Sequence, residues 1–177
     1  MSLRDHGRPR STDHYPYLIT TRRESLTLIW RPGEGDALDE LVVDDLGRLL
    51  AFPDLKTLRE YCNRNGRELI WEEEATLDLA AVRRWVEHPD PGSVSVGLLL
   101  EAWNFFEDLS RSLKAYPSLP SQRSIHDSAY EKIFGGDALE PAAGEGAWTD
   151  EETAAVREFL RAGLALWQQA VRGSGTG

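Results

Sequence analysis

Carboxylates are the abundant side chains in this sequence that could do chemistry, and they gather in two short runs. The first run places six acids within twelve residues, with no basic residue between them: Glu34, Asp36, Asp39, Glu40, Asp44 and Asp45. The second run is Glu72, Glu73 and Glu74. Clustered carboxylates can act as acid–base catalysts, bind a cation or form a solvated surface. The spacing of the acids along the chain can distinguish between these three roles.

The spacing of these acids does not match a calcium-binding loop and does not suggest a pair of catalytic carboxylates. A calcium loop would need alternating Asp or Asn, a central Gly and a closing Glu, and this pattern is missing. A glycosidase needs two carboxylates at a fixed separation in a cleft, and runs of acids on loops do not indicate such a pair. The two favoured interpretations are a solvated acidic face and a docking surface for a cationic protein. All nine acids are therefore candidate partner-binding residues.

The other residue types that carry chemistry are scattered along the chain. The four histidines, His6, His14, His88 and His126, show no metal-ligand spacing. Cys62 falls on the inner face of an expected helix, where a small core residue is the ordinary role. Neither a P-loop nor a dinucleotide-binding fingerprint is present. We therefore expect no catalytic residue, no metal site and no cofactor, and a non-enzymatic role. An enzyme that uses Asp and Glu chemistry is the alternative.

The charge of the chain favours a cationic partner. Thirty acids against twenty Lys and Arg give a net charge of −10. Binding phosphates requires a concentrated cationic surface, so we expect no direct contact with nucleic acid. The uncharged apolar stretch 94–100 is too short to cross a bilayer, and a single cysteine is typical of a reducing compartment. These features predict a cytoplasmic protein without a membrane partner.

Periodicity along the chain predicts an α+β fold, with a small, mostly antiparallel sheet in the N-terminal half packed by helices from the C-terminal half. The alternation of β-branched and aromatic residues predicts strands at 17–21, 26–30, 41–43, 49–52 and 68–71. Apolar residues at helical spacing, together with capping residues, predict helices at 54–66, 78–87, 95–113, 128–134 and 149–172. We expect a flexible leader at 1–15, one domain at 16–172 and a flexible tail at 173–177.

One predicted helix carries a line of polar residues on an otherwise apolar surface. Glu101, Asn104, Asp108 and Arg111 follow one another at helical spacing. Because Arg111 comes three residues after Asp108, a surface ion pair is the simplest interpretation. A buried polar network or a functional site is the alternative.

The apolar pattern of the C-terminal half also resembles a known family. The residues that carry the resemblance are the run 100–109 with Ser112, the run 130–134 with Leu139, and 148–152 with Gly163 and Leu164. In these positions the chain is similar to immunity proteins of bacterial contact-dependent growth inhibition systems. Such proteins bind a toxin domain delivered by a neighbouring cell, often a nuclease, and neutralise it in the cytoplasm.

The resemblance implies that this chain is an immunity protein whose partner is a cognate, basic toxin. It covers roughly the C-terminal half and consists of helix-packing patterns, so no toxin-contacting residue is carried over. The loop 135–146 and the segment before Tyr15 have no counterpart in it. An interaction module without a toxin partner is a further alternative.

Overall fold

In the computed structural model, the N-terminal half begins with an antiparallel hairpin, as predicted. The hairpin consists of β1 (Tyr15–Thr20) and β2 (Ser25–Arg31). In the turn, the Thr21 hydroxyl accepts hydrogen bonds from the amides of Arg23 and Glu24 at 3.3 and 3.2 Å. A turn closed by its own side chain fixes the register of the two strands.

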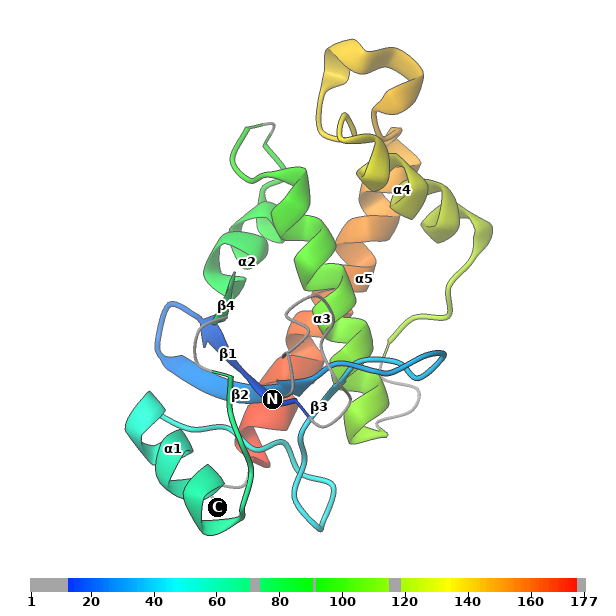
Figure 1. The fold of residues 1–177 in the computed structure, drawn as a ribbon. Helices are drawn as coiled ribbons and strands as arrows, with labels where there is room; N and C mark the ends of the chain where they lie inside the picture. The colour runs from blue at the N-terminus through cyan, green and yellow to red at the C-terminus, as the bar shows by residue number, and fades with distance from the viewer. Residues whose placement is uncertain (1–12, 71–73, 91, 115–118, 175–177) are drawn as a thin grey trace, which may run out of the picture.

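Four strands form one mixed sheet in the order β3-β2-β1-β4. The short strand β3 (Glu40–Leu41) pairs antiparallel with β2, and β4 (Ala75–Asp78) pairs parallel with β1. The structure describes residues 13–70, 74–90, 92–114 and 119–174. In this part of the chain most helices come from the C-terminal half (Figure 1). The predicted α+β class is confirmed, with one parallel strand added to the antiparallel ones.

One predicted strand lies in the wrong place. Within 68–71, Leu69 forms only an isolated bridge with His14, and the Ile70 amide donates to the His14 carbonyl at 2.8 Å. Trp71 lies outside the described residues. Regular pairing with β1 begins at Ala75, in a segment that we did not predict as a strand. An apolar run indicates β propensity, but the site of pairing depends on residues distant in sequence.

The second predicted hairpin is present but short. Val43 and Leu49 form an isolated antiparallel bridge, and the Leu50 amide donates to the Val42 carbonyl at 3.3 Å. Beyond this hairpin, Phe52 bridges to Thr27 of β2, so the returning segment extends toward the sheet.

Apolar side chains fill both faces of the sheet. The larger core packs against three helices, α2 (Leu79–Glu87), α3 (Val96–Leu113) and α5 (Asp150–Arg172). A smaller core contains Ile29 and Phe52 together with Cys62 of α1 (Leu55–Arg64). Burial raises the pKa of the Cys62 thiol, which is consistent with the core role predicted for it.

The helices begin at the capping residues that the sequence indicates. The side chains of Asp78, Ser95 and Thr149 accept hydrogen bonds from first-turn amides of α2, α3 and α5, respectively. Thr149 and Glu152 form the predicted capping box. These caps explain why the three long helical predictions agree with the structure at their N-terminal ends.

The helix α4 (Ser124–Gly135) is longer than the predicted 128–134, and a 3₁₀ segment, η1 (Pro141–Gly146), follows it. The N-terminal end of α4 is capped by His126, whose Nδ1 accepts a hydrogen bond from the Arg123 amide at 3.0 Å. Histidine is not among the usual capping residues, so the sequence does not flag this start. No helix in the described segments is long and apolar enough to span a membrane.

The described residues include the last three positions of the expected leader and the first two positions of the expected tail. β1 begins at Tyr15, the last residue of the expected leader, and this side chain is buried. At the other end, the Gly173 amide donates to the Gln169 carbonyl and closes α5. Residues 1–12 and 175–177 lie outside the described part of the chain.

Candidate functional site

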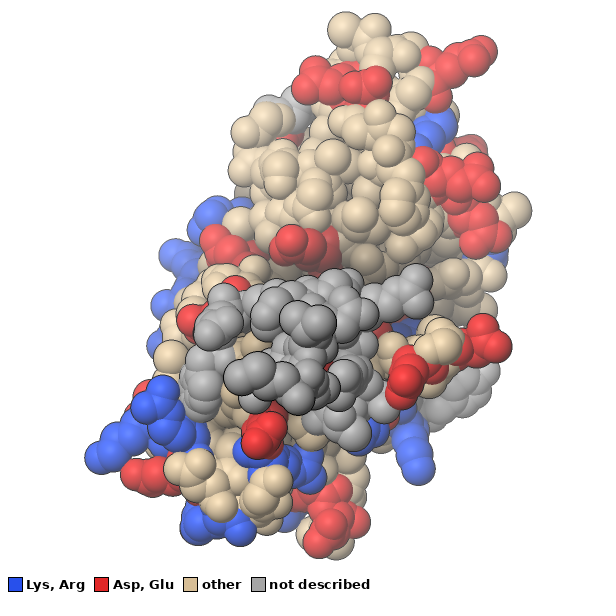
Figure 2. Space-filling model, in the orientation of Figure 1, with Lys and Arg blue, Asp and Glu red and all other residues tan. Residues whose placement is uncertain are grey.

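A groove of about 950 Å³ runs between the β2–β3 loop and the end of α3. Its walls hold four of the predicted acids, Glu34, Asp36, Asp39 and Glu40, together with His14, Arg31, Leu38, Arg111 and Ser112. We refer to this groove, defined by these residues, as the acidic groove. In Figure 1 the loop lies beside the C-terminal end of α3, and Figure 2 shows acidic side chains in the same region. Two segments distant in sequence therefore form one surface feature.

The β2–β3 loop, residues 32–39, has a fixed shape. The Gly33 amide donates to the Asp39 carboxylate at 2.9 Å, and the Ala37 amide donates to the Glu34 carbonyl at 3.1 Å. A Cβ atom at Gly33 would lie 1.9 Å from the Ala37 carbonyl oxygen, so the close approach of the backbone requires glycine here. Hydrogen bonds within the loop thus set its conformation.

Two side chains at the end of α3 fasten this loop to the helix. The Ser112 hydroxyl accepts a hydrogen bond from the Leu41 amide at 2.8 Å and donates to the Asp108 carbonyl at 2.7 Å. Arg111 donates to the Asp39 carbonyl at 3.2 Å and forms an ion pair with Asp108. The helix therefore supports the loop through side chains as well as through packing.

The carboxyl group of Asp108 sits in an unusual environment. Burial raises its pKa to about 7, the Asp39 and Glu107 carboxylates act in the same direction, and the Arg111 guanidinium opposes them. The ion pair predicted from the sequence is present. Its acid, however, has a side chain only 16% exposed, so the pair lies at the edge of the core.

Four acids along the acidic groove have different roles. Asp39 accepts the loop hydrogen bond described above, and Glu40 forms an ion pair with Arg31 of β2. Glu34 and Asp36 are exposed. Asp39 and Glu40 therefore maintain the loop, and Glu34 and Asp36 are its more exposed acids.

The other predicted acids that the structure describes, Asp44, Asp45 and Glu74, lie outside the acidic groove. Asp44 and Asp45 are in the second hairpin, where the Asp44 carboxylate accepts hydrogen bonds from the Leu46 and Arg48 amides, both at 2.9 Å. These hydrogen bonds lower the pKa of Asp44, and they stabilise the turn of the hairpin. Glu72 and Glu73 lie outside the described residues, and Glu74 is exposed just before β4. Among the described residues, the first run is thus divided between the acidic groove and the second hairpin, and Glu74 lines neither.

The sequence did not identify Leu38 or Ser112 as site residues. Leu38 is 64% exposed, in a loop that also carries the acids Asp36 and Asp39. Leu38 is not part of a helical or alternating apolar pattern, so the sequence does not distinguish it from the rest of the loop. For Arg111 the sequence favoured a surface ion pair over a functional site, because its contact with the loop joins residues that are 72 positions apart.

The chemistry available in the acidic groove is that of carboxylates, two guanidinium groups, an imidazole and a hydroxyl. In the described part of the chain, no group of three or more His, Cys, Asp and Glu side chains could hold a metal ion. The arrangement is suited to binding a surface that presents cationic groups around an apolar contact.

Comparisons with known proteins give a fold relationship. No protein-family model matches the chain, and no curated protein is significantly similar to it in sequence. Among solved structures, the fold is similar to the C-terminal domain of SatS, determined in complex with bromine, with a TM-score of 0.59. The alignment covers 93% of this chain and 94% of that domain at 14% sequence identity. At this level of identity, the similarity is one of fold alone.

Proposed function

We propose that this chain is an immunity protein that binds and neutralises a cognate toxin domain, a nuclease, by occluding its active site. The family resemblance on which the proposal draws lies in residues of α3, α4 and α5 and in the segment between α4 and α5. In this proposal those helices form the scaffold, and the acidic groove is the surface that contacts the toxin. The protein acts in the cytoplasm, without contact with nucleic acid or membrane.

The exposed side chain of Leu38 is the observation that carries this proposal. Leucine at 64% exposure on a loop fixed by hydrogen bonds is an apolar anchor available to a partner. Protein interfaces bury apolar anchors at their centre and surround them with polar groups, and the neighbouring acids supply such a rim. A loop that already has its bound shape loses little conformational entropy on association.

The charge of the loop fits a basic partner. A nuclease carries cationic side chains that hold phosphates, and carboxylates at Glu34 and Asp36 can take the place of that substrate charge. Complementary charges accelerate association, and salt screens this effect. The proposal therefore predicts that the association rate falls steeply as the ionic strength rises.

The test is a growth-rescue assay against the toxin encoded beside the gene, combined with a binding assay on purified proteins. Leu38→Asp should weaken toxin binding by at least tenfold, about the loss of one interface anchor. Reversal of Glu34 and Asp36 to Lys should slow association. Asp39 and Glu40 are left unchanged because they maintain the loop.

The second hairpin offers a matched control. Leu46 is 76% exposed, and Asp45 is exposed beside it. Leu46→Asp and Asp45→Lys change the same residue types on a different loop and should leave binding unchanged. Equal effects of both sets of variants would contradict the acidic groove as the contact surface. Failure of the unaltered protein to bind the toxin would contradict the immunity function.

A second candidate, an enzyme using carboxylate chemistry, is favoured by the pKa of about 7 at Asp108. A carboxyl group that titrates near neutral pH is suited to general acid–base catalysis. The ion pair with Arg111 gives Asp108 a structural role as well. The variant Asp108→Asn separates the candidates, because toxin neutralisation should at most be weakened by the loss of the pair with Arg111, whereas an acid–base enzyme would lose its activity.

A further inference from the structure

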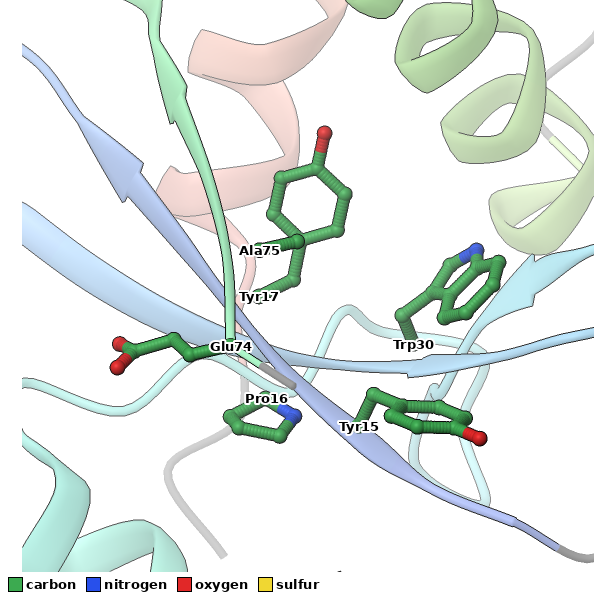
Figure 3. Close-up of a pocket in the computed structure, with 6 residues that line it drawn as sticks. All are labelled: Tyr15, Pro16, Tyr17, Trp30, Glu74 and Ala75. Carbon is green, nitrogen blue, oxygen red and sulfur yellow. The ribbon is translucent and has the colours of Figure 1, made fainter. Parts of the chain in front are cut away.

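A second hollow, of about 260 Å³, is lined by three aromatic rings. These are Tyr15, Tyr17 and Trp30, and we refer to the hollow between them as the aromatic recess. Figure 3 shows Tyr17 and Trp30 on the same side of the hairpin with a gap between their rings, and Tyr15 next to Trp30. Glu74 and Ala75 line the recess from β4, with the Glu74 carboxylate directed away from the rings (Figure 3).

Strand geometry explains why the three rings come together. Tyr15 and Tyr17 are two residues apart in β1, so they lie on one face of the sheet, and Trp30 is opposite Tyr15 in β2. The Tyr15 and Trp30 ring centroids are 5.5 Å apart, and the Tyr17 ring packs against Phe105 at 5.6 Å. Packed rings on paired strands make walls that need little rearrangement to receive a ligand.

Two acidic side chains of α3, Glu101 and Asp108, act electrostatically on the Tyr17 ring of the recess. Burial raises the pKa of the Tyr17 phenol, and the nearby carboxylates of Glu101 and Asp108 raise it further. The same field that disfavours a phenolate favours a cation close to the ring. The aromatic recess thus combines aromatic rings with the nearby acids Glu101 and Asp108, of which Asp108 is also paired with Arg111.

The aromatic recess neighbours the acidic groove. His14 and Arg31 of the groove adjoin Tyr15 and Trp30 of the recess along the same extended segments, so their backbones are adjacent while their side chains point to opposite faces of the sheet. Asp108 also connects the two, because it is paired with Arg111 of the groove and acts on Tyr17 of the recess. A partner on the acidic groove would therefore have the aromatic recess within reach.

The size and chemistry of the recess select one kind of occupant. At about 260 Å³ it is smaller than the roughly 300–1,000 Å³ of pockets that enclose a whole ligand, so it suits a single side chain. Aromatic faces attract cations, and a guanidinium group stacks on them at a lower cost in hydration than an ammonium group. We propose that the aromatic recess receives an arginine side chain of the protein that docks on the acidic groove. This inference rests on the proposed function.

The first test uses arginine amide as the probe and needs no toxin. Nuclear magnetic resonance of the ¹⁵N-labelled full-length protein follows the Trp30 indole N–H signal, assigned with a Trp30→Phe variant. Arginine amide should shift this signal in a saturable way. Citrulline amide, which has nearly the same shape without the charge, should not shift it. An equal response to both compounds, or no response to either, would overturn the inference.

The second test measures toxin binding by aromatic variants. Trp30→Leu and Tyr17→Leu should each raise the dissociation constant by about tenfold or more, as expected for an interface anchor. Tyr61→Leu is the matched control, because Tyr61 is a half-buried aromatic residue packed against Phe52 in the smaller core. Circular dichroism verifies that each variant is folded. Parent-like affinity in both recess variants would overturn the inference and leave the immunity function standing.

The alternative occupant of the aromatic recess is an arginine from the N-terminal segment of this chain. Arg4, Arg8 and Arg10 precede β1 in sequence. In the absence of any ligand, their replacement by Gln should leave the Trp30 indole signal unchanged. A shift of that signal, with stronger binding of arginine amide to the variant, would identify the occupant as this segment and overturn the proposal of a partner arginine. If the unaltered protein does not bind the toxin, the immunity function fails, while the comparison with citrulline amide still decides whether the recess selects a guanidinium group.

Discussion

The indole ring of Trp103 stacks on the phenyl ring of Phe159, with centroids 4.3 Å apart and planes inclined by 18°. This contact joins α3 to α5 in the larger core. Trp103 is only 1% exposed, and its Nε1 donates to the Glu107 carboxylate at 2.5 Å. The pair therefore combines aromatic packing with a satisfied polar group at the edge of the core.

We predict that Trp103→Ala lowers the free energy of unfolding by about 3–5 kcal/mol, the range for truncating a large buried aromatic residue. Trp167, also buried, should respond in the same way. Urea denaturation at constant pH gives the values. The exposed Leu46 provides the control, since Leu46→Ala should stay within about 0.5 kcal/mol of the parent. A comparably small change at Trp103 would contradict its place in the core.

A second prediction concerns the close approach of α3 and α5. A Cβ atom at Gly163 would lie 2.2 Å from Cδ2 of Phe106, so Gly163→Ala should destabilise the protein by about 1–3 kcal/mol through overpacking. The double variant with Phe106→Leu should recover part of this loss, and a double-mutant cycle measures the coupling. Gly97→Ala is the control, because its nearest neighbour would be the Ser95 hydroxyl at 3.9 Å. Additive effects of the two core changes would argue against the steric explanation.

A third prediction concerns the pH dependence that Asp108 gives to stability. Because the pKa of Asp108 is raised to about 7 in the folded state, the folded protein binds this proton more tightly than the unfolded chain does. Its contribution to stability is therefore present at low pH and is lost as the pH rises toward and through 7. The melting temperature of Asp108→Asn, relative to the parent, should increase between pH 5 and pH 8. A difference that does not change with pH would show that the carboxyl titrates normally.

A fourth prediction concerns His126, whose effect on stability changes with pH in the direction opposite to that of Asp108. Burial lowers the pKa of His126, and the Arg123 guanidinium lowers it further. The unfolded chain then binds this proton more readily, so stability falls as the pH drops below the ordinary histidine range, about 6.5. His126→Gln should reduce the loss of melting temperature between pH 7 and pH 5. The exposed His88 is the control position, and an identical pH response in His126→Gln and His88→Gln would contradict the assignment.

Sequence reasoning succeeded where the signal is local. The capping box of Thr149 and Glu152 and the apolar face that follows it identify α5 from adjacent residues alone. The β1–β2 hairpin is also local, since a short turn joins two alternating segments. In both cases the residues that determine the element lie within a few positions of one another.

The parts that sequence reasoning missed depend on distant contacts. The pairing of Ala75 with Tyr17 brings β4 to the edge of β1 across 58 positions, and nothing in either segment specifies that register. The acidic groove poses the same difficulty. Its acids were recognised, but the hydrogen bond from the Leu41 amide to Ser112 that positions them spans 71 residues. The four acids of the groove were therefore predictable, whereas its other lining residues and its shape were not.

The bond between Leu41 and Ser112 also has a consequence for the order of events during synthesis. The ribosome makes the β2–β3 loop early, but the side chains that fasten it belong to the last turn of α3. A nascent chain that ends before residue 112 already carries the acids and Leu38, yet lacks the support for their final arrangement. Competence to bind a partner through this surface should therefore arise only after α3 has left the ribosome and folded, well after the loop itself has been made.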